Sequence, residues 1–233
     1  MGKGRTRLGP AAAAALVALV GSVPASRAAQ SVRAVLGNTI ISRHDPAVAI
    51  KVPSAFHYVG TDRFVLSDRN LGKFDQCELY SFVDANASQH IRKFYWIQFE
   101  AYLPSQPHIH HAYDSPRHVT IAGLDFYLDT WVSAAGTPPE PGSDQAHFYA
   151  LLASHGYRRS DFMYLRLVHL TDATKRKELM IIYAESLAGS GYTAAQLDKG
   201  GAQHARWAAI DNALIRRGER SVALRTLEHS SNR

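Results

Sequence analysis

Six segments of the chain alternate between aromatic or β-branched side chains and other residues, and this alternation constrains the fold more than any other feature. A strand places successive side chains on opposite faces, so a period of two predicts strands. Short polar turns separate most of the segments, as is typical of neighbouring antiparallel strands. The predicted strands are 56–66, 77–84, 91–103, 119–132, 161–170 and 178–187.

Two helices complete the predicted fold. Ser143 is a good N-cap for a helix that begins at residue 144 and ends before Gly156. A second helix is predicted over 202–218, because alanine, isoleucine and leucine recur there at helical spacing. Strands in runs, with the helices set apart from them, predict an α+β fold. We expect a curved antiparallel sheet of about six strands, packed against the C-terminal helix and one additional mid-chain helix.

The N-terminus predicts export. A basic start is followed by a short run rich in alanine and valine, with small residues before a possible cleavage after Ala28. This pattern is typical of a secretory signal peptide, and the run is shorter than a membrane-spanning helix. We expect a periplasmic or extracellular protein. The predicted organisation is a signal peptide at 1–28, an extended lead-in at 29–50, a single α+β domain at 51–227 and a disordered tail at 228–233.

Removal of the signal peptide lowers the net positive charge of the chain, which bears on whether it could bind nucleic acid. The whole chain has 26 basic and 20 acidic residues, and four of the basic residues lie within 1–28. The remaining chain carries 22 basic and 20 acidic residues, which gives no basic face of the kind that nucleic-acid binding requires. No later segment is long and apolar enough to cross a bilayer, so we expect no transmembrane segment after signal removal. The sequence leaves the oligomeric state open.

Residues 107–114 read PHIHHAYD and raise the question of a metal site. In an extended chain, His108 and His110 project to one side, roughly 6.5–7 Å apart, and His111 projects to the other. A zinc or copper ion held there needs further ligands. Candidates from the same region are Asp114, His118 and Glu100. The alternatives are a solvated loop, which we favour, and a loop that changes charge near pH 6. We therefore expect no cofactor, with zinc or copper at His108, His110 and His118 as the alternative.

The sequence contains none of the short motifs of hydrolases, phosphate loops or zinc fingers. Cys77 is the only cysteine, and its place in an alternating segment predicts a buried strand residue rather than a nucleophile. Paired carboxylates for glycosidic cleavage remain open because their pairing is spatial, with Glu100 and Glu185 as candidates. The absence of motifs favours a protein that is not an enzyme.

On several predicted strands, the face opposite the apolar row carries large aromatic side chains interrupted by a few ionisable groups. A mostly apolar row with a few polar atoms is typical of a ligand site. The alternative is a sheet covered on both faces, with Arg166 in a buried ion pair with Glu185 or Glu100. The candidate ligand-binding residues are Trp96, Glu100, Tyr102, Tyr127, Arg166 and Glu185.

We therefore expect an exported, non-catalytic domain that binds a small, partly apolar ligand or another envelope component. Two alternatives remain open: a metal-assisted hydrolase that uses the His108/His110 region, and a structural or assembly partner without a pocket.

Overall fold

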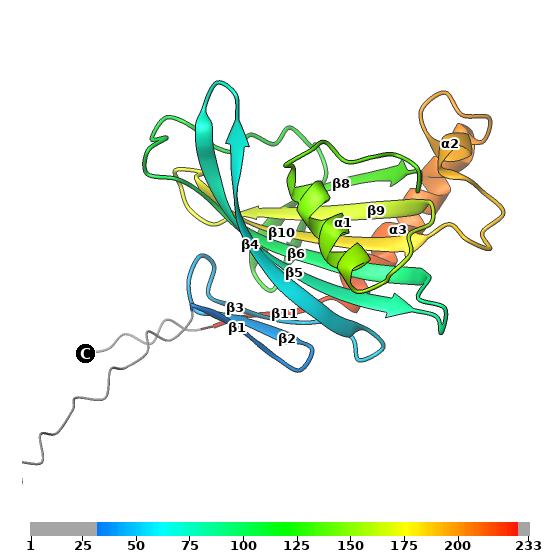
Figure 1. Ribbon diagram of the computed structural model, residues 1–233, viewed down its shortest axis with the longest axis horizontal. Helices are drawn as coiled ribbons and strands as arrows, with labels where there is room; N and C mark the ends of the chain where they lie inside the picture. The colour runs from blue at the N-terminus through cyan, green and yellow to red at the C-terminus, as the bar shows by residue number, and fades with distance from the viewer. Residues whose placement is uncertain (1–31, 228–233) are drawn as a thin grey trace, which may run out of the picture. The chain divides into compact units, whose positions relative to one another are not determined.

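The segments with period-two alternation form one antiparallel sheet in the computed structural model, which describes residues 32–227 (Figure 1). The strands lie in the order β4-β5-β6-β10-β9-β8-β7. The predicted antiparallel sheet is confirmed, but it has seven strands rather than about six. The strands are β4 (His57–Asp68), β5 (Gly72–Ala85), β6 (Ile91–Tyr102), β7 (His118–Ile121), β8 (Leu124–Ser133), β9 (Phe162–Leu170) and β10 (Lys177–Ser186).

The seventh strand arises because the segment 119–132, predicted as one strand, turns back on itself. Ala122 and Gly123 have φ values of 52° and 80°, and β7 pairs with β8 across them. Glycine adopts this left-handed conformation at no steric cost, so Gly123 marks a hairpin turn.

A second antiparallel sheet contains β1 (Arg33–Leu36), β2 (Thr39–Ser42), β3 (Val48–Lys51) and β11 (Ala223–Thr226), in the order β1-β2-β3-β11. Three of these strands lie within or at the end of the segment 29–50, which was predicted as an extended lead-in without strand pairing of its own. Each of these strands has four residues, too few to establish a period of two. In β3, Val48, Ala49 and Ile50 are all buried, so no alternation marks the strand.

Both predicted helices are present, although the second begins at Trp207 rather than at residue 202. α1 (Asp144–Ser154) begins at Ser143, whose Oγ accepts a hydrogen bond of 3.1 Å from the backbone N–H of Ala146. α2 (Ala194–Leu197) is one turn long, and α3 (Trp207–Ser221) follows a short 3₁₀ turn. After α3 the chain continues into β11 of the second sheet, a strand that was not predicted.

The two faces of the seven-stranded sheet enter two different cores. On β6, Tyr95, Ile97 and Phe99 pack with the small sheet and α3, whereas Phe94 and Trp96 pack with α1. Figure 1 shows α1 in front of the sheet and α3 behind it. We call the side that carries α1 the α1 face and the other side the α3 face.

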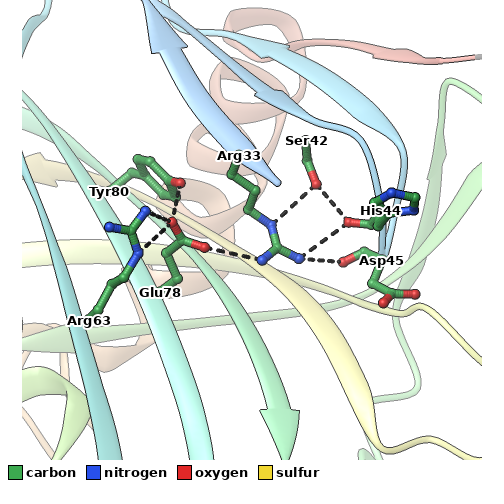
Figure 2. A network of polar contacts seen from close by, with 7 residues as sticks. All are labelled: Arg33, Ser42, His44, Asp45, Arg63, Glu78 and Tyr80. Carbon is green, nitrogen blue, oxygen red and sulfur yellow. Dashed lines mark hydrogen bonds and ion pairs between the residues drawn. The ribbon is translucent and has the colours of Figure 1, made fainter. Parts of the chain in front are cut away.

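Arg33 and Glu78 connect the two sheets on the α3 face (Figure 2). The Arg33 guanidinium donates to Glu78 Oε2 at 3.1 Å, to Ser42 Oγ at 3.2 Å and to the backbone oxygens of His44 and Asp45. Glu78 also accepts hydrogen bonds from Arg63 and Tyr80, which lie on the large sheet. Burial opposes ionisation of Glu78, but these donors outweigh it and lower the pKa of the carboxyl.

The predicted signal peptide at 1–28 and the predicted tail at 228–233 lie outside the described residues. Within the described residues, no helix has the length and apolar character needed to cross a bilayer.

Candidate functional site

The α1 face of the large sheet carries a pocket of about 290 Å³ at the start of α1. Two indoles and two aliphatic side chains form its apolar walls, and Arg166 and the first residues of α1 supply polar groups. The pocket is lined by Trp96, Trp131, Glu140, Ser143, Asp144, Gln145, Arg166, Met180 and Ile182. A concavity that joins apolar walls to converging polar groups can hold a small molecule.

Aromatic stacking holds the two indoles of the pocket in place. Trp96 stacks on Phe148 of α1 with ring centroids 4.7 Å apart and an interplanar angle of 12°. Trp131 stacks on Tyr164 at 4.9 Å and 5°. Because both indoles are fixed by a neighbouring ring, the pocket presents rigid flat walls.

Arg166 is the cation of the pocket. Its Nη2 donates to Asp129 Oδ2 at 2.7 Å, and its guanidinium lies 5.4 Å from the ring centre of Tyr113 and 5.8 Å from that of Trp131. Its Nε is buried without a hydrogen-bond partner. A buried N–H that lacks an acceptor is costly, so this atom is suited to a ligand oxygen. The predicted alternative, an ion pair with Glu185 or Glu100, is wrong, since Asp129 takes that place.

A group of three acids and one histidine lies on the same face, and all of them are buried except Glu100, which is half-buried. The acids are Asp75 of β5, Glu100 of β6 and Glu178 of β10, and the histidine is His111 of the 103–117 loop. Glu100 and Glu178 are direct cross-strand partners, an arrangement that is unfavourable for two like charges. One ligand atom from each of Asp75, Glu100 and His111 lies within 4.8 Å of the other two. We call these four residues the acid–histidine cluster.

Contacts with neighbouring side chains orient His111, Glu178 and Glu100. His111 Nδ1 lies 3.0 Å from Glu178 Oε2, which also accepts a hydrogen bond of 2.7 Å from the Tyr113 hydroxyl. Gln98 Nε2 donates to Glu100 Oε1 at 2.7 Å. Trp96 Nε1, from the pocket wall, donates to Gln98 Oε1 at 2.8 Å and so links the pocket to the cluster.

Burial controls the protonation of the acids. It raises the pKa of Asp75 to about 6, and His111 opposes part of the rise. It raises the pKa of Glu100 well above the ordinary value, and the nearby charges of Glu178 and Asp75 raise it further. Burial also raises the pKa of Asp144, at the start of α1. Burial therefore favours the protonated forms of Asp75 and Glu100 over their charged forms, and a bound cation would offset the same negative charge.

Arg176 holds the 103–117 loop over the sheet. Its guanidinium donates to the backbone oxygens of Gln106 at 2.6 Å and Ile109 at 2.8 Å. The backbone N–H of His111 donates to Lys175 O at 2.8 Å. The loop therefore places His111 inside the protein, because its backbone is attached just before that position and at it.

The three histidines predicted as metal ligands do not belong to the acid–histidine cluster. His108, His110 and His118 are exposed, and His118 pairs with Asp125 at 3.1 Å. His111, which the sequence placed on the other side of an extended chain, is 6% exposed and stacks on Tyr102 with centroids 4.3 Å apart.

The predicted ligand-binding residues are divided among several places. Trp96 and Arg166 share the 290 Å³ pocket. Glu100 belongs to the cluster and lines a separate pocket of about 240 Å³. Tyr102 covers His111, and Tyr127 lies 5.6 Å from the ring of Tyr113.

Glu185 lies on the α3 face, where Arg217 of α3 donates to both of its oxygens at 2.8 Å. Glu100 and Glu185 therefore lie on opposite faces of the sheet and do not form a carboxylate pair for glycosidic cleavage. Cys77 is buried, as predicted, and burial raises the pKa of its thiol far above the ordinary value.

Sequence reasoning missed Asp75, His111 and Glu178. A carboxylate in an otherwise apolar row was the signal that selected Glu100 and Glu185. The same signal marks Asp75, which shares a row with Cys77 and Leu79, and Glu178, which shares one with Met180. No such pattern marks His111, because the loop that carries it has no regular alternation of apolar and polar residues.

Comparison of the chain with protein-family models, curated proteins and solved structures finds no match.

Proposed function

We propose that this chain is an exported protein that binds a small, partly apolar ligand in the pocket at the start of α1. The observation that carries the proposal is the combination of two fixed indoles with a buried, unpartnered N–H of Arg166 in one concavity of about 290 Å³. The indoles suit a flat apolar group, and the Arg166 Nε suits a carbonyl or carboxylate oxygen. The ligand class is therefore a planar molecule with one acceptor group.

The ligand class can be tested with two probes of the same shape, 2-naphthoate and 2-naphthylmethanol. We expect titration calorimetry to show binding of the carboxylate and weaker binding of the alcohol. Replacing Arg166 with Met should weaken carboxylate binding about 10- to 100-fold, since a hydrogen bond to a charged group contributes roughly 1.5–3 kcal/mol. Arg92→Met is the matched control, because Arg92 is exposed and pairs with Asp84 away from the pocket.

Trp131→Leu should weaken the binding of both probes, because it removes the flat wall without removing the charge. Equal affinity of the wild type and the Arg166→Met variant for 2-naphthoate would contradict the proposed orientation. Failure of both probes to bind at millimolar concentration would contradict the ligand class.

Export is the second part of the proposal and rests on the N-terminal pattern. Expression of the full chain in a bacterial host should yield a periplasmic or secreted product whose mass lacks residues 1–28. Arginine in place of Ala28 removes the small residue before the predicted cleavage and should leave the full-length mass. A full-length, cytoplasmic wild-type product would contradict this part of the proposal.

A further inference from the structure

Cationic side chains of the described residues do not balance the negative charge that the carboxyl groups of the acid–histidine cluster would carry. Three carboxyl groups share one imidazole, and within residues 32–227 no lysine or arginine forms an ion pair with Asp75, Glu100 or Glu178. Asp75 is 2% exposed and Glu178 is 1% exposed, so water does not screen them. Buried carboxylates are stable only when they are protonated, paired or bound to a metal ion.

Two atoms of the cluster also lack hydrogen-bond partners. Asp75 Oδ1 and His111 Nε2 are both buried and unpaired among the described residues. Because buried polar atoms are almost always satisfied, two unpaired atoms in one cluster indicate a missing binding partner. One of them is a carboxylate oxygen and the other an imidazole nitrogen, and both are common metal ligands.

The surroundings of His111 match those of a metal-binding histidine. A ligating imidazole usually donates its second ring N–H to a carboxylate, which fixes the tautomer and the ring orientation. His111 Nδ1 lies 3.0 Å from Glu178 Oε2, and this contact leaves the lone pair on Nε2. Glu178 is in turn held by the Tyr113 hydroxyl at 2.7 Å. Glu100 is oriented in the same way by Gln98.

We propose that Asp75, Glu100 and His111 bind a divalent transition-metal ion, with Glu178 as the residue that positions His111. The three ligand atoms lie within 4.8 Å of one another. Two ligands about 2.1 Å from one ion are roughly 3.4 Å apart in a tetrahedral site, so binding requires them to approach by up to about 1.4 Å. One imidazole and two carboxylates suit Zn²⁺ and Mn²⁺, and three protein ligands leave a coordination position open.

The test uses untagged full-length protein, because a polyhistidine tag binds the same ions. After treatment with EDTA and dialysis, titration calorimetry with ZnCl₂ and with MnCl₂ should show one ion bound per chain with micromolar or tighter affinity for at least one metal. His111→Gln should weaken binding at least 100-fold, and Asp75→Asn at least 10-fold. Glu178→Gln should weaken it about 10- to 100-fold, as expected for a residue that orients a ligand.

His110→Gln is the matched control, because His110 is the neighbouring residue of the same loop and is exposed. Its affinity for the metal should equal that of the wild type. Each variant is checked by thermal unfolding, and crystals soaked in MnCl₂ locate the ion by anomalous scattering without any substitution. An anomalous peak between Asp75, Glu100 and His111 would support the proposal even if His111→Gln does not fold.

Three results would overturn the inference. One is the lack of saturable binding below 1 mM for both metals, which would mean that protons alone neutralise the acids. The second is unchanged affinity in His111→Gln. The third is an anomalous peak in the exposed His108/His110 loop instead of the cluster. The inference does not rest on the ligand proposed for the pocket, and repeating the naphthoate titration on EDTA-treated protein separates failure of one from failure of the other.

Discussion

Glu185 shows how single residues on the α3 face stabilise the fold. It is 7% exposed and accepts hydrogen bonds from Arg217 and from the Tyr183 hydroxyl, and Lys93 Nζ lies 3.5 Å away. Burial opposes its ionisation, but these donors outweigh it and lower the pKa of the carboxyl. The ion pair therefore links α3 to the sheet.

Replacing Arg217 with Met should lower the free energy of unfolding at pH 7 by about 2 kcal/mol, because a buried carboxylate loses its bidentate partner. Tyr183 and Lys93 remain as partners, which keeps the loss below that of an unpaired buried charge. A carboxyl with a lowered pKa stabilises the folded state above its unfolded pKa, and this contribution is lost as the pH falls through the folded pKa. The difference between the wild type and the variant should therefore shrink below about pH 4.

Urea unfolding at pH 7 and at pH 3.5 measures this difference. Arg216→Met is the control, because Arg216 is the exposed neighbour on the same helix, and its effect should stay within about 0.5 kcal/mol. An Arg217→Met difference that is the same at both pH values would show that the side chain acts through packing rather than charge.

The sequence identified the type of residue in the site better than it identified the residues themselves. The aromatic and ionic mixture on the strands is real, and Trp96 and Arg166 do share a pocket. His111 could not be distinguished from His110, because neighbouring positions in an irregular loop carry no sign of which one points inward. That choice is made by Arg176 and Lys175, which attach the loop backbone from a distant part of the chain.

At the scale of elements, α1 combines buried side chains, Phe148 and Leu152 among them, with a side-chain cap at its start. Ser143 Oγ accepts the Ala146 N–H at 3.1 Å and donates to Glu140 O at 2.7 Å. Ser143 is also part of the pocket wall, so the cap positions the polar end of the site.

Ser143→Ala should lower the free energy of unfolding by about 1 kcal/mol, the usual effect of losing an N-cap side chain. Chemical denaturation measures it. Ser154→Ala is the control, because Ser154 is an exposed serine at the other end of α1 and donates only to the Leu151 backbone oxygen and contacts His155. Equal effects of the two substitutions would mean that the cap contributes nothing specific to the start of the helix.

The elements that sequence reasoning found are long, and those that it missed are short. β4, β5, β6, β9 and β10 have nine or more residues each, which is enough for a period of two to be visible. β1, β2, β3 and β11 have four residues each and are stabilised by pairing with one another. Such strands follow from tertiary contacts, which a local pattern does not record.

At the scale of the whole molecule, the small sheet joins segments from the two ends of the described chain. β11 pairs with β3 in an antiparallel register, and the backbone N–H of Leu227 donates to Ala47 O at 2.8 Å. Val222, just before β11, is 6% exposed, and Val48 and Ile50 of β3 are fully buried. Val222, after α3, therefore belongs to the core on the α3 face, although no strand was predicted in this part of the domain.

A chain that ends at Ser221 should lose roughly 3 kcal/mol or more of unfolding free energy, because it lacks the buried Val222 and the hydrogen bonds between β11 and β3. A chain that ends at Leu227 keeps both and should unfold like the full-length protein. Denaturation of the two truncated proteins and the full-length chain under the same conditions measures the difference. If both truncations are equally stable, β11 is not required for the small sheet. If the chain that ends at Leu227 is also destabilised, residues 228–233 contribute to the fold, contrary to their prediction as a tail.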